Sequence, residues 1–193
     1  MIGFRGSQFV ALIAALSCAA AAPAASRPPV QLLRSTFATQ FTAKVLASHN
    51  AARAQAGLPG MAWDNELGKS AAAHARRLAL SNRFQHSDRR ARNGVGENLW
   101  MGTRGAFSIE RMVGDWVSER RWFVPGVFPA VTRTRSWADV GHYTQIIWPA
   151  TTRVGCALAS NASADYLVCH YSPAGNIDGR TVGLPMRRGF AGR

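Results

Sequence analysis

The chain has 193 residues, a formal net charge of +13 and 47% hydrophobic residues, which suits one domain with a buried core. The positive charge favours anionic partners, although composition bias and solubility explain it equally well. Because no basic stripe is interleaved with aromatic residues, we expect no nucleic-acid binding.

The first 25 residues have the features of a secretory signal peptide. Arg5 precedes an apolar run from Phe9 to Cys18, and an alanine-rich stretch from Ala19 to Ala25 offers several cleavage options. The apolar run is shorter than the roughly 20 residues that a membrane span needs. We therefore predict a secreted or periplasmic protein, with lipid anchoring through Cys18 as the minor alternative.

Two helices are predicted in the next part of the chain. Residues 26–39 are rich in proline and arginine and indicate a linker. Apolar residues then recur at helical spacing over residues 40–56. Asp64 follows as a capping residue and predicts the start of a second helix over residues 65–82.

The middle of the chain combines a strand, a helix and a long irregular segment. Residues 95–100 indicate a short strand, and Ser108 caps a predicted helix over residues 108–121. Residues 123–139 contain two prolines and two arginines without a clear period. Irregular segments of this length in a compact domain are usually functional or mobile.

Three strands are predicted near the C-terminus, over residues 143–148, 154–159 and 166–171. The tail over residues 181–193 is basic and lacks periodicity, so we expect it to be loosely held. Helices that precede hairpin-connected strands predict an α+β domain over residues 40–180, with helices covering an antiparallel sheet.

Two cysteines remain once the predicted signal peptide is removed. Cys156 and Cys169 form an even pair in an exported chain, which indicates one disulfide. A hairpin turning near residues 161–165 would place them across from each other on neighbouring strands. Two buried free thiols are the alternative, which export disfavours.

Two histidines and two glutamates are the candidate functional residues: His86, Glu97, Glu119 and His142. Glu97 interrupts an apolar strand, where a charge is costly unless it is paired. Glu119 follows a tryptophan by three positions and is expected to face the interior or a cleft. Such a set can form a metal site or an acid–base site. The alternatives are a solvated loop histidine, a strand-capping histidine and a solvated helix charge.

The other three histidines are predicted to be structural. His49 and Arg53 lie one helical turn apart and suit a hydrogen-bonding role. His74 lies on the apolar stripe of the second predicted helix. His170 is the penultimate residue of a strand that looks buried.

Taken together, the chain resembles the CAP superfamily of cysteine-rich secretory proteins, antigen 5 and pathogenesis-related 1 proteins, over about residues 43–179. Any one motif is weak, but seven in family order are specific. The motifs are HNAAR at 49–53, MAWDNELGKSAAAHA at 61–75, HS at 86–87, GENL at 96–99, W-x-x-E at 116–119, GHYTQIIW at 141–148 and YSPAGN at 171–176.

The resemblance implies a three-layer α-β-α sandwich with a central antiparallel sheet flanked by helices. It also implies a cleft where His86, Glu97, Glu119 and His142 converge, and in which His86 and His142 can hold zinc. The chain departs from many eukaryotic members because it keeps two cysteines and has no cysteine-rich second domain. We therefore expect a stand-alone bacterial member.

The function implied by this resemblance is binding. We expect a secreted monomer whose cleft takes a lipid, a sterol, a glycan or a host or competitor surface protein. The alternative is a zinc-dependent hydrolase in which Glu97 or Glu119 acts as the general base. A third possibility is a cationic protein that acts through surface charge alone.

Overall fold

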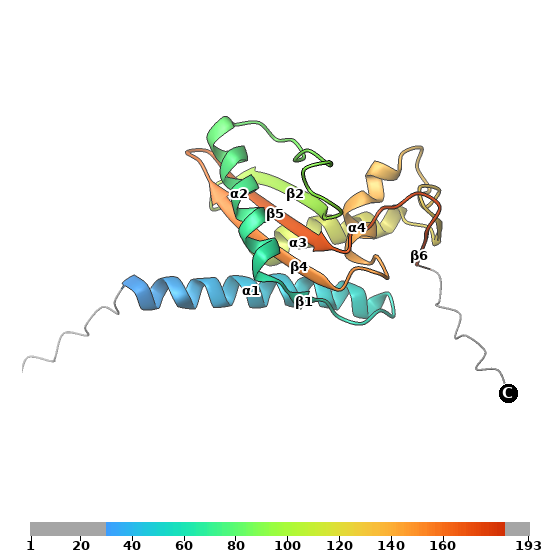
Figure 1. Cartoon of the computed structure of the whole chain (residues 1–193), viewed down its shortest axis with the longest axis horizontal. Coiled ribbons are helices and arrows are strands. Elements are labelled where there is room, and N and C mark those ends of the chain that lie inside the picture. The colour runs from blue at the N-terminus through green and yellow to red at the C-terminus, as the bar shows by residue number, and fades with distance from the viewer. Residues whose placement is uncertain (1–29, 184–193) are drawn as a thin grey trace, which may run out of the picture.

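A four-stranded sheet between two layers of helices forms the centre of the protein (Figure 1). The structure is a computed structural model that describes residues 30–183, with side chains from residue 38 onward. The predicted signal peptide and residues 184–193 of the predicted tail lie outside this range. The elements are α1 (Val30–Gln55), β1 (Ala62–Trp63), α2 (Asn65–Ser81), β2 (Gly96–Thr103), α3 (Ile109–Ser118), η1 (Glu119–Trp122), β3 (Gly126–Val127), η2 (Trp137–Val140), α4 (Gly141–Ile146), β4 (Arg153–Ser160), β5 (Ala164–Ser172) and β6 (Thr181–Val182).

The strands of the central sheet follow the order β1-β4-β5-β2. β5 pairs in antiparallel register with both β4 and β2 along their full lengths. The two residues of β1 run parallel to the start of β4, so the sheet is mixed rather than wholly antiparallel. The predicted α+β class and three-layer sandwich are confirmed.

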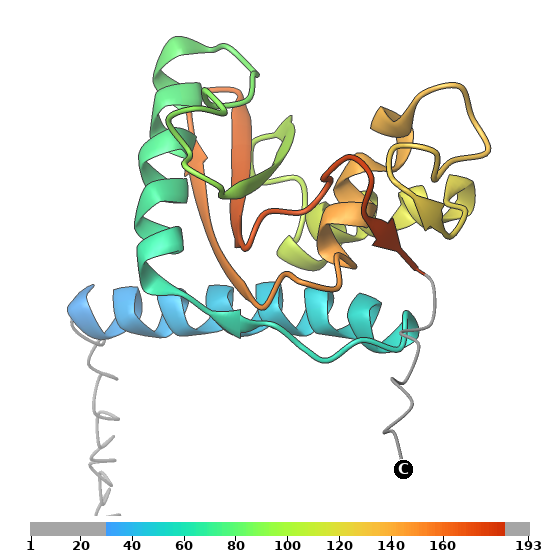
Figure 2. The same cartoon turned by 45° about the vertical axis from the view of Figure 1, so that its right-hand side comes forward.

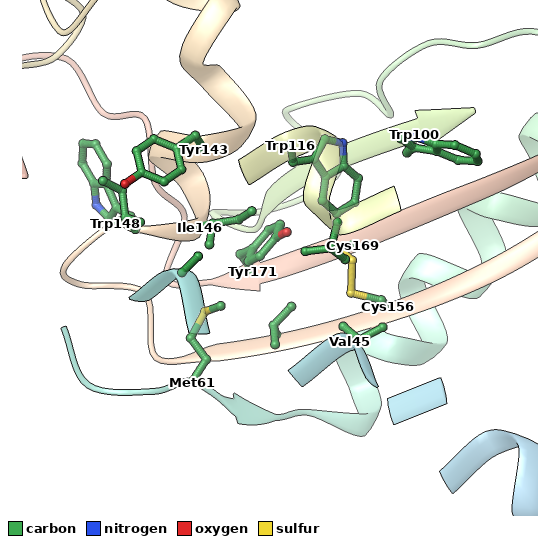
Figure 3. Packing of buried hydrophobic residues seen from close by; sticks show 14 of the residues in the cluster. Val45, Met61, Trp100, Trp116, Tyr143, Ile146, Trp148, Cys156, Cys169 and Tyr171 are labelled. Carbon is green, nitrogen blue, oxygen red and sulfur yellow. A yellow bond between two sulfur atoms is a disulfide. The ribbon is translucent and has the colours of Figure 1, made fainter. Parts of the chain in front are cut away.

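The helices cover the two faces of the sheet unequally. α2 crosses one face alone and packs on β4 and β5 over a small cluster of aliphatic side chains and Tyr166 (Figures 1 and 2). α1, α3 and α4 pack together on the other face. This second side holds the larger core, in which Trp100, Trp116, Trp148 and Tyr171 are buried (Figure 3). Most of the burial that stabilises the domain therefore lies on the side of α1 and α3.

A disulfide joins the two strands of the C-terminal hairpin, as predicted. Cys156 on β4 is bonded to Cys169 on β5, and the two residues are direct cross-strand partners. Their Cα atoms are 4.1 Å apart, the close spacing typical of a pair that exchanges no backbone hydrogen bonds. Both side chains therefore point into the larger core, where Figure 3 shows the bond.

The first family motif is structural, as predicted. His49 is fully buried, with Nδ1 2.8 Å from the carbonyl of Val45 and Nε2 2.9 Å from the hydroxyl of Tyr171. Arg53 is also buried and donates to the carbonyls of Ile146 and Trp148, each at 2.9 Å. These contacts attach α1 to β5 and to the C-terminal end of α4.

The strand predicted over residues 143–148 is wrong, because this segment begins in α4. Every residue from Tyr143 to Trp148 is buried, so the segment shows neither the alternation of a strand nor the single apolar face of a helix. The hydroxyl of Thr144 bonds the carbonyls of Val140 and Gly141, which closes the first turn of the helix.

Three further boundaries differ from the predictions. α1 begins at Val30, so the segment predicted as a linker is helical from that residue onward. The irregular region over residues 123–139 contains β3, which pairs with β6. The start of the predicted loose tail is therefore a strand, in which Val182 is buried. Within residues 30–183, no helix combines the length and apolar character that a membrane span requires.

Burial of His49 predicts acid sensitivity. Burial, opposed by the hydrogen bond to Val45, lowers the pKa of His49 to about 4, from 6.5 for an exposed histidine. Between these values the unfolded chain binds more protons than the folded protein, so the free energy of unfolding falls as the pH drops. We expect a loss of about 2 kcal/mol from this group between about pH 7 and pH 4.5, measured by urea denaturation.

The matched variant is His49→Gln, which does not titrate in this range. It should lack this component of the pH dependence, whatever its stability at neutral pH. If wild type and variant lose stability equally on acidification, other groups cause the sensitivity.

Candidate functional site

A cleft of about 540 Å³ opens between β2, α4 and residues 174–178. His86, Glu97 and His142 belong to its lining, whereas Glu119 does not. Segments that are far apart in the sequence thus contribute to one site. The lining also includes Arg92, Asn98, Phe128, Trp137, Gln145 and Asn176.

Glu97 is the buried centre of one side of the cleft. Its side chain has no exposed surface, and its carboxylate accepts five hydrogen bonds from four residues. His86 Nδ1 and an Arg92 guanidinium nitrogen lie 2.7 and 2.6 Å from Oε1. Ser87 Oγ and His170 Nε2 lie 2.6 and 3.0 Å from Oε2, and the backbone N–H of Ser87 lies 3.0 Å from Oε1.

These contacts explain how a carboxylate survives in an apolar strand. Burial alone would raise the pKa of Glu97, but hydrogen bonds from His170, His86 and Ser87 hold it well below its ordinary range. Glu97 is therefore ionised at neutral pH. The expectation that this charge must be paired agrees with the structure.

Arg92 and His170 are members of this network that the sequence analysis missed. Arg92 reaches Glu97 because Asn93 and Gly94 adopt positive φ angles of 49° and 80° and reverse the chain. The Asn-Gly pair is a turn signal that predicts such a reversal. His170 is the direct cross-strand partner of Glu97 in the β2–β5 pairing, which only the strand register reveals.

His142 is held on the other side of the cleft by Glu119. The carboxylate lies 2.5 Å from His142 Nδ1 and accepts the backbone N–H groups of His142 and Tyr143 at 2.9 and 3.0 Å. Glu119 therefore satisfies the free N–H groups at the start of α4. The imidazole also stacks on Trp116, with 5.8 Å between ring centroids, and Asn98 donates to the His142 carbonyl.

The two cleft histidines share one arrangement. Each places Nδ1 within hydrogen-bond distance of a glutamate carboxylate. Because a carboxylate accepts hydrogen bonds, Nδ1 is the donor, and in the neutral ring Nε2 then presents a lone pair. Within the described range, neither Nε2 has a hydrogen-bond partner. Imidazoles oriented by carboxylates in this way are typical of metal ligands. With 56% and 32% of their side chains exposed, His86 and His142 are accessible to solutes in the cleft.

The cleft offers two histidine donors rather than a complete metal cage. Among the residues described, the only group of three close donors is His49, Cys156 and Cys169. Both sulfurs of that group are consumed by the disulfide, and both nitrogens of His49 are hydrogen-bonded, so it cannot bind a metal. A metal in the cleft would take its remaining ligands from water or from a bound molecule.

Close packing around Gln145 forms part of the cleft wall. A side chain at Gly96 would collide with the amide of Gln145, so glycine is required at the start of β2. Gln145 accepts the N–H of Gly175 at 2.9 Å and donates to Thr151 at 3.2 Å. The glycines of GENL and YSPAGN therefore make room for one buried amide that joins three segments.

Comparison with known proteins gives a consistent result. A profile of the Cysteine-rich secretory protein family, CAP, matches residues 46–171. Pathogenesis-related protein 1C of Nicotiana tabacum is 33% identical over 138 residues, which cover 70% of this chain and 77% of that protein. Secreted protein RBT4 of Candida albicans is 31% identical over 146 residues, but the match covers 37% of its length.

Solved structures share the fold. The crystal structure of NaASP2 with Zn2+ superposes with a TM-score of 0.63 at 27% identity, over 72% of this chain and 83% of that one. Hookworm Platelet Inhibitor superposes with a TM-score of 0.57 at 19% identity, over 74% of each chain. The second likeness concerns the fold alone.

The Glu97 network generates a stability prediction. Glu97→Gln removes the charge that balances the Arg92 guanidinium, whose side chain is only 15% exposed. Breaking a buried ion pair costs about 3–5 kcal/mol, so we expect a loss of that size in the free energy of unfolding. Glu110→Gln is the control, because it removes an exposed partner of Lys44 and should change stability little. Equal losses from both variants would mean that the Glu97 network does not stabilise the domain.

Proposed function

The chain belongs to the Cysteine-rich secretory protein family, CAP, and on that premise we propose that it is an exported binding protein whose ligand enters the central cleft. One observation carries this proposal. His86 and His142, 56 positions apart by their numbers, line the same cleft, and their Nε2 atoms have no hydrogen-bond partner among the residues that the structure describes. Their orientation is maintained by two carboxylates, which favours a binding role over a purely structural one.

The proposed metal is zinc, held by His86 and His142. The donor chemistry fits, because zinc takes neutral imidazole nitrogens whose opposite N–H groups are held by carboxylates. The structurally similar protein NaASP2 has been crystallised with Zn2+, which supports the same assignment. When bound, zinc would supply a positive centre that accepts an oxygen of the ligand. The chain itself contributes the two nitrogens and their orientation through Glu97 and Glu119.

The proposed ligand is a lipid, a sterol, a glycan or a segment of a partner protein. The cleft presents the rings of Phe128 and Trp137 beside polar groups of Asn98, Gln145 and Asn176. A wall with both characters suits a molecule that combines an apolar body with oxygen functions. Relatives named as pathogenesis-related proteins and as a secreted protein support export. The proposed protein is of bacterial source and either secreted or periplasmic, with lipid anchoring through Cys18 as the minor alternative.

A zinc-dependent hydrolase is the weaker alternative. A general base needs a carboxylate oxygen free to take a proton from water. Both oxygens of Glu97 and both oxygens of Glu119 already accept hydrogen bonds. A hydrolytic role would therefore require one of these networks to open when substrate binds.

Zinc affinity tests the proposed site. We expect micromolar or tighter binding to the wild type in calorimetry, and a loss of at least about tenfold in His86→Ala and in His142→Ala. Glu119→Gln should weaken binding about 10–100-fold, because it removes the group that orients His142. Glu110→Gln is the matched control for Glu119→Gln, since Glu110 lies outside the cleft lining and pairs with the exposed Lys44.

Acidification provides a second readout of the same site. Zinc binding requires unprotonated imidazole nitrogens, so affinity should be lower at about pH 5 than at about pH 7.5. If the affinity does not change over this range, or if Glu110→Gln weakens binding as much as Glu119→Gln, the histidine assignment is wrong.

Turnover assays separate binding from hydrolysis. The wild type and a Glu119→Ala, His142→Ala double variant are compared on panels of peptides, esters and glycosides. We expect the same background rate from both proteins. A rate that is present in the wild type and absent from the double variant would favour the hydrolase.

A further inference from the structure

A second cavity lies on the opposite flank of the protein, at the edge of the central sheet. It encloses about 600 Å³ between the N-terminal half of α1, the start of α2 and β4. Figure 2 shows the start of α2 beside this half of α1, and Figure 1 shows β4 on the side of the sheet nearest α1. None of the four candidate residues of the central cleft lines it.

The floor of this cavity is an open strand edge. β1 pairs with only Arg153 and Val154 at the start of β4, where the N–H of Asp64 bonds the carbonyl of Val154 at 2.9 Å. Successive residues of a strand direct their backbone groups to opposite sides, so Cys156 and Leu158 point the same way as Val154. In the part of the chain that the structure describes, no hydrogen bond reaches these groups from that side.

The pairing of β4 with β5 supports this assignment. Cys156 and Cys169 have the short Cα spacing of a pair without mutual backbone hydrogen bonds, so the N–H and carbonyl of Cys156 face the cavity. Cys156 is only 4% exposed. Buried backbone groups almost always have a partner, and here the described chain supplies none.

The walls of the cavity are apolar and carry no net charge. Phe41 and Trp63 form an edge-to-face pair on the side of α1, with 6.4 Å between ring centroids. Gly68 and Ala72 of α2 line the other side, where Gly68 lies close to the Trp63 ring. At the rim, Lys69 is neutralised by Glu66 at 2.6 Å, which leaves no unpaired charge among the lining residues for an ionic head group.

We propose that the free edge of β4 binds an extended peptide segment of a partner protein as an additional strand. The segment would continue the line of β1, pair with the backbone of Cys156 and Leu158, and place apolar side chains against the two walls. The edge of β4 offers alternating N–H donors and C=O acceptors between two apolar walls. A peptide backbone carries the complementary groups, whereas a fatty acid or a sterol does not. A strand of about five residues, roughly 17 Å long, spans the open part of the edge. This inference is independent of the function proposed for the central cleft.

Amide hydrogen exchange followed by NMR tests the proposal on the intact, disulfide-bonded protein. The probes are capped pentapeptides that alternate valine or leucine with threonine. We expect them to slow exchange of the Cys156 and Leu158 amides, and to leave the amides of the central cleft unchanged. If no peptide of this panel protects the two amides at millimolar concentration, the proposal is overturned.

Backbone methylation distinguishes strand pairing from general apolar binding. The same pentapeptides, N-methylated at the residues that face β4, keep their side chains but lose their donors. We expect at least about tenfold weaker binding, since each lost backbone hydrogen bond leaves a buried group without a partner. Equal binding of methylated and unmethylated peptides would overturn strand addition.

A pair of variants provides the protein side of the test. Leu158→Pro removes a donor that faces the cavity without removing a hydrogen bond to β5, because proline is tolerated where an edge N–H points outward. It should abolish protection at Cys156, whereas Leu158→Ala, which keeps the donor, should retain it. Equal protection in both variants would contradict the proposal, and the methylated peptides decide the question if Leu158→Pro does not fold.

Discussion

The buried carboxylate of Glu97 is the constraint around which the candidate site is organised. An ionised group without exposed surface needs several partners, and Glu97 takes them from a loop, a turn and the neighbouring strand. One of those partners is His86, whose orientation is therefore a consequence of neutralising Glu97. The same principle operates across the cleft, where Glu119 joins His142 to the start of α4. The hydrogen bonds that pair the carboxylates of Glu97 and Glu119 thus fix the orientation of both imidazoles.

Much of the fold follows from local signals in the sequence. Asp64 and Ser108 cap helices as expected, since their side chains accept backbone N–H groups at the start of α2 and α3. The cysteine pair follows from a hairpin with short, regular strands. The structure of residues 143–148 could not be predicted in this way, because all six residues are buried and show no periodic pattern of apolar and polar side chains. Tertiary packing, not propensity, makes that segment helical.

The site was only partly predictable for a similar reason. A glutamate in an apolar strand reveals its own need for partners, but it does not say which residues supply them. His170 reaches Glu97 through the register of β2 and β5, and Arg92 reaches it through a turn whose outcome depends on the loop around it. Both are long-range or conformational effects that leave no periodic trace. The disulfide cysteines, in contrast, needed only the length of one hairpin.

Each cleft histidine donates a hydrogen bond from its Nδ1–H to a carboxylate and turns Nε2, which carries no proton in the neutral ring, toward the cleft. Long-range nitrogen–proton NMR of the imidazole rings reads the position of that proton directly. We predict the Nδ1-protonated tautomer for both His86 and His142 at neutral pH. Added zinc should shift the Nε2 resonances of the two rings and leave their Nδ1 resonances unchanged. Protonation at Nε2 in either ring, with Nδ1 unprotonated, would contradict this prediction.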